Sequence, residues 1–138
     1  MTTRRAVVTG ASSGIGEAVV RALRASGWDV VGVARRAERL AALDAEVGSR
    51  SFAADLTSEA DVAALAAHVA STGDVHALVH VAGGARGTDR VEDGSPEDWR
   101  WMFEANVLST QLVTAALLPL LRGGIRAGGG HADTLYVT

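Results

Sequence analysis

The chain has 138 residues, of which 48% are hydrophobic and 21% charged, as in an ordinary globular domain. Its length predicts one domain over residues 1–138 with a single core. The net charge of −3 argues against a nucleic-acid partner, because such proteins gain affinity by neutralising phosphates. Cysteine is absent, which excludes disulfides and cysteine nucleophiles and favours a reducing, cytoplasmic location.

Lysine is absent as well, since all 13 basic residues are arginine, and Tyr136 is the single tyrosine. This excludes Schiff-base chemistry and the phosphate loop of NTPases, both of which need a lysine. No group of His, Asp and Glu has metal-ligand spacing, so no metal site is expected. The longest helical apolar stretch, Leu112–Leu121, is interrupted by Thr114 and Pro119. It falls short of the roughly 18 residues that span a bilayer, so no membrane partner is expected.

Short apolar runs alternate with longer amphipathic segments along the chain. Strands are predicted at residues 5–9, 28–34, 51–54, 75–81 and 132–137. Helices are predicted at residues 15–26, 37–47, 59–70 and 96–121, the last as one helix or two. Helical crossovers of this length predict a parallel sheet covered on both faces. The α/β alternation therefore favours a doubly wound parallel sheet with five strands.

Local signals mark the ends of several elements. Ser58 is a predicted N-cap, and Ser95 with Pro96 predicts the start of the last helix. Gly48 is a predicted helix stop. Five glycines in the eight residues 123–130 predict a flexible connection, because glycine weakens both helices and strands.

A glycine-rich segment, Thr9–Gly16, joins the first strand to the first helix. Its glycines allow a tight turn, and the backbone N–H groups at the helix start can reach a pyrophosphate. The spacing differs from the usual G-x-G-x-x-G, but the strand–loop–helix context favours nucleotide binding over a plain turn. The predicted cofactor contacts are Gly10, Ser12, Ser13, Gly14, Ile15 and Gly16.

This segment resembles the cofactor loop of the short-chain dehydrogenase/reductase family, and three further motifs follow in the family's order. Asp55-Leu56 resembles the pair whose aspartate contacts the adenine, and Ala82-Gly83 resembles the end of the family's Asn-Asn-Ala-Gly. Asn106 matches the asparagine of the catalytic Asn-Ser-Tyr-Lys set, where it has a supporting, water-positioning role. The resemblance implies a Rossmann-type fold, a nicotinamide cofactor, a small carbonyl or alcohol substrate and a homo-oligomeric full-length form.

The choice of dinucleotide depends on the residues after the second strand. An NAD site usually has an acid about 20 residues past the glycine loop, for the ribose 2′-hydroxyl. The segment here is Val33-Ala34-Arg35-Arg36, which has no acid. Because two arginines can form charge-assisted bonds with a 2′-phosphate, NADP(H) is predicted over NAD(H). The alternative is that the arginines are solvated charges, for which Arg36 is the better candidate.

The chain also departs from the family. His80 and Val81 replace two asparagines, the first of which ties adjacent strands together; His80 can donate one such bond, and a buried structural role is favoured over a catalytic one. The resemblance places the family's serine, tyrosine and lysine after the fifth strand, and Tyr136 lies inside that predicted strand. Two interpretations stay open: the cofactor-binding half of a reductase, inactive without the C-terminal catalytic portion, or a non-catalytic dinucleotide-binding module. Asn106 favours the first.

Overall fold

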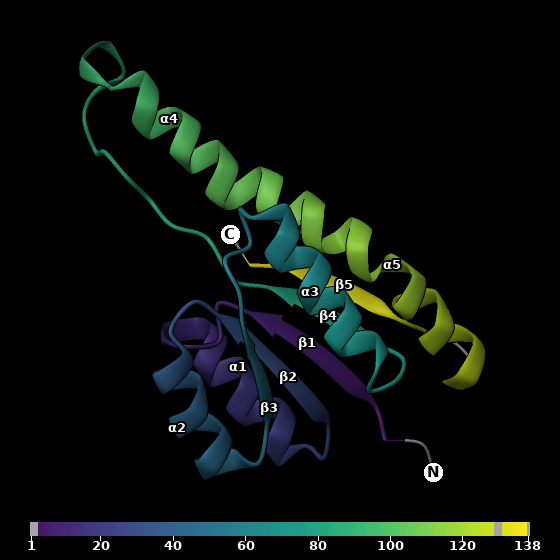
Figure 1. Cartoon of the computed structure of the whole chain (residues 1–138). Helices are drawn as coiled ribbons and strands as arrows, with labels where there is room; N and C mark the ends of the chain where they lie inside the picture. Colours follow the sequence, from purple (N-terminus) through teal and green to yellow (C-terminus); the bar gives the residue numbers. More distant parts are fainter. Residues whose placement is uncertain (1–2, 129–130, 138) are drawn as a thin grey trace.

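Five parallel strands form one sheet in the order β3-β2-β1-β4-β5 (Figure 1). The strands are β1 (Arg5–Thr9), β2 (Asp29–Ala34), β3 (Arg50–Ala53), β4 (Ala77–His80) and β5 (Asp133–Tyr136). The helices are α1 (Gly14–Ala25), α2 (Ala37–Val47), α3 (Glu59–Ala70), α4 (Pro96–Phe103) and α5 (Ser109–Gly128), with short helical turns η1 (Val91–Asp93) and η2 (Glu104–Leu108). This computed structural model describes residues 3–128 and 131–137. The predicted doubly wound parallel sheet is confirmed.

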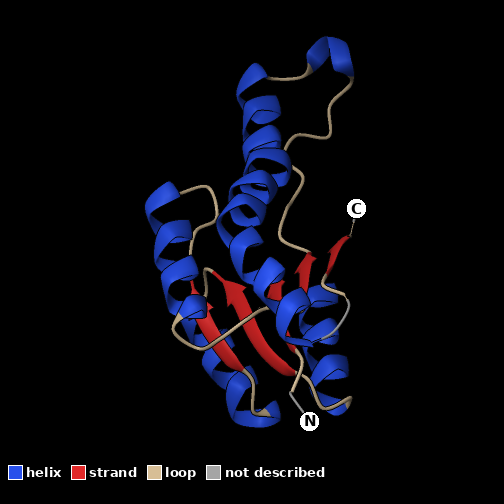
Figure 2. Ribbon diagram, turned by 90° about the vertical axis from the view of Figure 1, so that its right-hand side faces the viewer, coloured by secondary structure: helices blue, strands red, loops and turns tan. Residues whose placement is uncertain are grey.

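Helices cover both faces of the sheet, α1 and α2 on one side and α3 and α5 on the other (Figures 1 and 2). The alternation of side chains along β1 divides the core accordingly. Val7 packs with Leu65 and Leu117 from α3 and α5, whereas Val8 packs with Val20 and Leu40 from α1 and α2. All six side chains are buried. Because both faces are covered, strands rich in valine can lie in the middle of the sheet.

Most predicted ends of elements are found close to their expected positions. The hydroxyl of Ser58 accepts a hydrogen bond from the N–H of Asp61 at 3.2 Å, which confirms the predicted N-cap. Gly48 ends α2 with φ of 71°, in the left-handed region. Pro96 begins α4, but the Ser95 hydroxyl donates to the carboxylate of Glu97 and does not cap the helix.

The predicted flexible connection after residue 122 is wrong, because α5 continues to Gly128. The reason lies in packing: a Cβ on Gly123 would overlap the carboxylate of Asp74, and one on Gly124 would overlap the carbonyl of Val75. These glycines therefore allow α5 to approach the segment before β4, which outweighs their helix cost of about 1 kcal/mol each. Gly129 and Gly130, which the prediction also covered, lie outside the described residues.

The run from α4 through η2 to α5 forms a continuous helix, Pro96–Arg126, that is long and apolar enough by length and composition to cross a membrane. Its most apolar 18-residue window has a mean hydropathy of 1.2. The expectation that this stretch is too short to span a bilayer is therefore wrong by length and composition, because the helix continues through Thr114 and Pro119. A buried stripe at every fourth position, Ser109, Val113, Leu117 and Leu121, faces the rest of the chain. Packing in an α/β layer accounts for this stripe without a membrane.

Candidate functional site

A cavity of about 490 Å³ opens beyond the carboxyl ends of β1, β2, β3 and β4. The strand order places β1 between β2 and β4. The strands that follow β1 are thus added first on one side of it and then on the other, and this change of side is the switch point of the sheet. In open α/β sheets, ligands bind at this kind of switch point. The cavity brings together every predicted cofactor contact except Gly16: Gly10, Ser12, Ser13, Gly14, Ile15, Arg35, Arg36, Asp55, Leu56, Ala82 and Gly83.

The glycine loop at this cavity depends on close backbone contacts. Gly10 has φ of 66°, and a Cβ there would lie 2.8 Å from the backbone nitrogen of Ala82. A Cβ on Gly16 would overlap the carbonyl of Gly10, so Gly16 is a packing residue behind the loop. Ile15 lines the cavity although 59% of it is exposed. The first N–H groups of α1 lack partners within the helix, as an anion-binding helix start requires.

A buried hydroxyl that the sequence analysis did not single out joins the loops after β1 and β4. Thr9 Oγ1 donates to the carbonyl of Val79 at 3.5 Å and accepts from the N–H groups of Val81 and Ala82, both at 3.1 Å. By resemblance, an asparagine of the family ties adjacent strands together here. The sequence analysis predicted that His80, which replaces this asparagine, would donate one such bond. Thr9 was visible in the motif, but only the fold brings it beside β4.

His80 makes different contacts. Its Nε2 lies 3.0 Å from the Thr114 hydroxyl on α5, and its ring stacks on Tyr136 of β5 with centroids 4.9 Å apart. The expected bond between strands is therefore replaced by contacts to α5 and β5. His80 is buried, in agreement with the predicted structural role, and burial lowers the pKa of its imidazole.

Arg35 and Arg36 follow β2 and line the cavity. Both are exposed, and neither has an ion-pair partner within residues 3–128 and 131–137. Asp55, also at the cavity, accepts hydrogen bonds from the hydroxyl and the N–H of Thr57 at 2.7 and 3.0 Å. These bonds, with a smaller contribution from the charge of Arg35, lower the pKa of the Asp55 carboxyl.

Asn106 does not line the cavity but positions the loop after β4. Its Oδ1 accepts from the N–H of Gly84 at 3.0 Å, and its Nδ2 donates to the carbonyls of Gly84 and Met102, both at 2.8 Å. A Cβ on Gly83 would overlap Oδ1 of Asn106. Asn106 lies in η2, where the helix widens to a π turn. The contact shown is with the loop, and the catalytic role stays a prediction.

The helical run adds a wall that the sequence analysis did not predict. Trp101, Ala105 and Ser109 line the cavity at intervals of four residues, so they share one helix face. A Cβ on Gly84 would lie 3.0 Å from Cη2 of Trp101, which shows how closely the ring approaches this loop. Their spacing was a usable signal, but the same spacing is typical of ordinary core packing.

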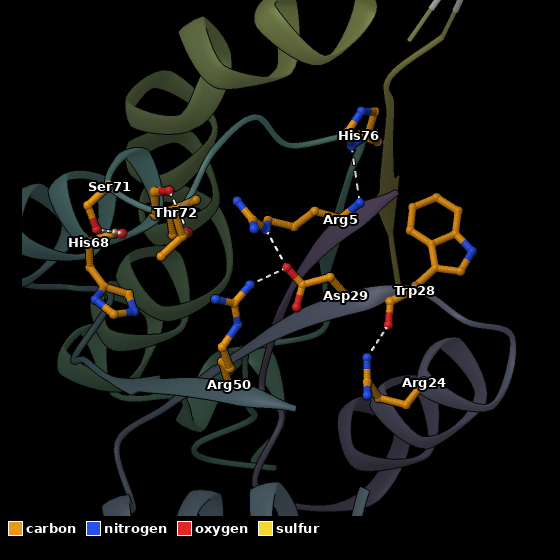
Figure 3. Close-up of polar contacts among 10 residues, drawn as sticks. Arg5, Arg24, Trp28, Asp29, Arg50, His68, Ser71, Thr72 and His76 are labelled. Carbon is orange, nitrogen blue, oxygen red and sulfur yellow. Dashed lines mark hydrogen bonds and ion pairs between the residues drawn. The ribbon is translucent and has the colours of Figure 1, made fainter. Parts of the chain in front are cut away.

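A second polar cluster lies at the opposite, amino end of the sheet (Figure 3). Arg5 Nε pairs with the Asp29 carboxylate at 2.8 Å, and Arg50 binds the same oxygen. Burial alone would raise the pKa of Asp29, but the two arginines outweigh it and lower that pKa. The backbone N–H of Arg5 donates to Nδ1 of His76 at 3.1 Å. Among the described residues, no group of three or more His, Asp or Glu can hold a metal ion.

Known proteins resemble this chain along almost its whole length. The family model for short chain dehydrogenase matches residues 4–131. An uncharacterized oxidoreductase of Mycobacterium tuberculosis is 53% identical over 132 residues, which cover 96% of this chain and 50% of the relative. An NADP-dependent 3-hydroxy acid dehydrogenase of Salmonella typhi is 34% identical over 128 residues, covering 91% of this chain and 50% of that protein.

A solved structure extends the match to three dimensions. The closed form of serine dehydrogenase complexed with NADP+ superposes with a TM-score of 0.85 at 30% identity. The match covers 96% of this chain and 52% of that one. This chain therefore spans about half the length of the relatives that it matches.

Proposed function

This chain belongs to the short chain dehydrogenase family, and we propose that it forms the dinucleotide-binding part of an NADP(H)-dependent oxidoreductase. The observation that carries the proposal is the cavity at the switch point, where the glycine loop, Arg35, Arg36 and the Asp55 loop meet; the two arginines form no ion pair with any residue that the structure describes. When bound, the nicotinamide exchanges a hydride with a small carbonyl or alcohol substrate. The residues of this chain bind and orient the cofactor.

Each part of the cavity has a distinct proposed role. The N–H groups at the start of α1, with Ser12 and Ser13, bind the pyrophosphate. Asp55 accepts a hydrogen bond from the adenine amine, and Leu56 packs beside the base. Gly83 lines the cavity and contacts the nicotinamide ribose, and Asn106 holds the neighbouring Gly84 in place.

The preference for NADP(H) rests on Arg35 and Arg36. Their guanidinium groups can form charge-assisted bonds with the 2′-phosphate, and the segment 33–36 has no acid that would bind a 2′-hydroxyl. The relative from Salmonella typhi is named as NADP-dependent, which supports the same preference.

Calorimetric titration of the chain with NADPH and NADH tests this proposal. We expect NADPH to bind at least tenfold more tightly, because a charge-assisted bond contributes about 1.5–3 kcal/mol. The double variant Ala34→Asp with Arg35→Ala should shift the preference toward NADH. Arg39→Ala removes an equal charge from the exposed surface of α2 and should change neither affinity. Equal binding of both dinucleotides, before and after the double change, would contradict the assignment.

Turnover requires a proton donor or acceptor at the substrate oxygen. This chain has no lysine, and its single tyrosine, Tyr136, is stacked on His80 within β5. We therefore propose that the 138 residues bind cofactor but do not reduce substrate by themselves. Steady NADPH oxidation by the isolated chain with a panel of carbonyl compounds would contradict this proposal.

A further inference from the structure

The segment after β4 carries an arginine, Arg86, that contacts Trp101, a residue of the cavity wall. We propose that Arg86, held by Trp101 and Asp98, binds the carboxylate of a substrate that carries both a carboxylate and the reacting alcohol or carbonyl. The inference rests on the proposed function, and it adds a substrate class and a residue that selects it.

Two contacts from α4 fix the Arg86 side chain. Its guanidinium carbon lies 6.0 Å from the ring centroid of Trp101, within the range of a cation–π interaction. Its Nε lies 3.0 Å from Oδ1 of Asp98. Asp98 and Trp101 are three residues apart on the helix, so both project from the same face. The Arg86 side chain is therefore already ordered before a ligand binds, and this order lowers the entropic cost of binding.

The backbone around Arg86 is also anchored. The backbone of Gly84 is held by the amide oxygen and nitrogen of Asn106, and a Cβ on Gly84 would lie 3.0 Å from Cη2 of Trp101. Gly87 has φ of 74°, and a Cβ there would lie 3.2 Å from the Cβ of Asp98. The loop is thus attached to the helical run on both sides of Arg86, although its side chains face solvent.

The charge of Arg86 is only partly used by these contacts. Asp98 contacts the guanidinium through Nε, and within the described part of the chain Arg86 has no second carboxylate partner. Because 59% of the side chain is exposed, a ligand in solution can reach it. The edge of a guanidinium that carries its two terminal nitrogens matches the geometry of a carboxylate, which gives specificity as well as affinity.

The position of Arg86 separates this role from cofactor binding. Trp101 and Gly83 line the cavity beside β4, whereas Arg35 and Arg36 line it beside β2, on the other side of β1. The proposed cofactor pose places its nicotinamide ribose at Gly83, three residues before Arg86. An anionic group bound by Arg86 therefore belongs to the molecule that meets the nicotinamide and not to the 2′-phosphate.

Nuclear magnetic resonance of the tryptophan indoles tests the inference, because the chain has only three tryptophans. The NADP+-loaded chain is titrated with 3-hydroxybutanoate, with its neutral counterpart 1,3-butanediol, and with sulfate at matched ionic strength. We expect the Trp101 indole signal, assigned with Trp101→Phe, to shift saturably with the carboxylate and at least tenfold more weakly with the diol and with sulfate. The Trp28 signal is an internal control, since Trp28 precedes β2 at the amino end of the sheet.

Substitutions connect the signal to the side chain. Arg86→Gln should abolish the preference for the carboxylate over the diol, and Arg86→Lys should keep only part of it, because lysine lacks the planar fork. Arg90→Gln removes an exposed arginine from the same segment and should leave the preference unchanged. NADP+ affinity, measured in parallel, shows that each variant is folded.

The outcomes separate the two proposals. Failure of the unsubstituted chain to bind NADP+ would overturn the proposed function and this inference with it. NADP+ binding without a carboxylate preference, an equal response to sulfate, or a preference that survives Arg86→Gln would overturn this inference alone.

Discussion

The two ends of the sheet use arginine in opposite ways. At the amino end, Arg5 and Arg50 converge on the Asp29 carboxylate, and this contact joins β1, β2 and β3 (Figure 3). At the carboxyl end, Arg35 and Arg36 border the cavity with no ion-pair partner among the described residues. A paired and half-buried arginine contributes to the fold, whereas an unpaired one leaves its charge available to a ligand.

The largest expected effect comes from breaking the amino-end cluster. Asp29→Asn leaves the half-buried Arg5 guanidinium without its counter-charge and should lower the free energy of unfolding by about 3 kcal/mol. Urea denaturation measures this loss, while the NADPH affinity of the folded chain should stay unchanged. Glu46→Gln is the matched control, because it breaks an exposed pair with Arg21 and should cost no more than about 0.5 kcal/mol. Equal effects of the two changes would remove the distinction between the ends.

A smaller effect is expected where Thr9 joins the loops at the carboxyl end. Thr9→Val keeps the shape of the side chain but removes the oxygen that accepts from the N–H groups of Val81 and Ala82. We expect a loss of about 2 kcal/mol in unfolding free energy, because a buried polar group loses its partner. Unlike Asp29→Asn, this change should also weaken NADPH binding, since Ala82 lines the cavity. Thr9→Ser retains the hydroxyl and should preserve NADPH affinity. Full NADPH affinity in Thr9→Val would contradict the proposal that the Thr9 hydroxyl supports cofactor binding.

The smallest effect concerns pH. Burial lowers the pKa of the His80 imidazole below its ordinary value of 6.5. As the pH falls below 6.5, His80 is therefore protonated more readily in the unfolded chain than in the folded one. The contribution of neutral His80 to stability is therefore present above pH 6.5 and is lost as the pH falls through the lower pKa of the folded state. His80→Asn should flatten the decline in unfolding free energy below pH 6.5. His131→Asn, at an exposed histidine, should not. An unchanged decline in His80→Asn would refute this assignment.

Local sequence patterns predicted the order of strands and helices because short apolar runs and amphipathic segments differ in period. The same patterns identified the glycine loop, the arginines after β2 and the Asp55 pair, which all lie directly after strands. They did not identify Trp101, whose spacing on a helix is compatible with ordinary packing. They also placed the end of the last helix too early, because the contacts of Gly123 and Gly124 with Asp74 and Val75 are distant in sequence.

By itself, the sequence determined the α/β alternation, the absence of lysine and cysteine chemistry, and the glycine loop at a strand–helix junction. These properties depend on residue type and on neighbours along the chain. Only the tertiary structure decided which side chains meet: Thr9 with the end of β4, Asn106 with Gly84, and Arg86 with Trp101 and Asp98. The physical reason is that hydrogen bonds and cation–π contacts require separations of a few ångströms. The packing of parallel strands and long helices brings residues that are far apart in the chain to within these distances.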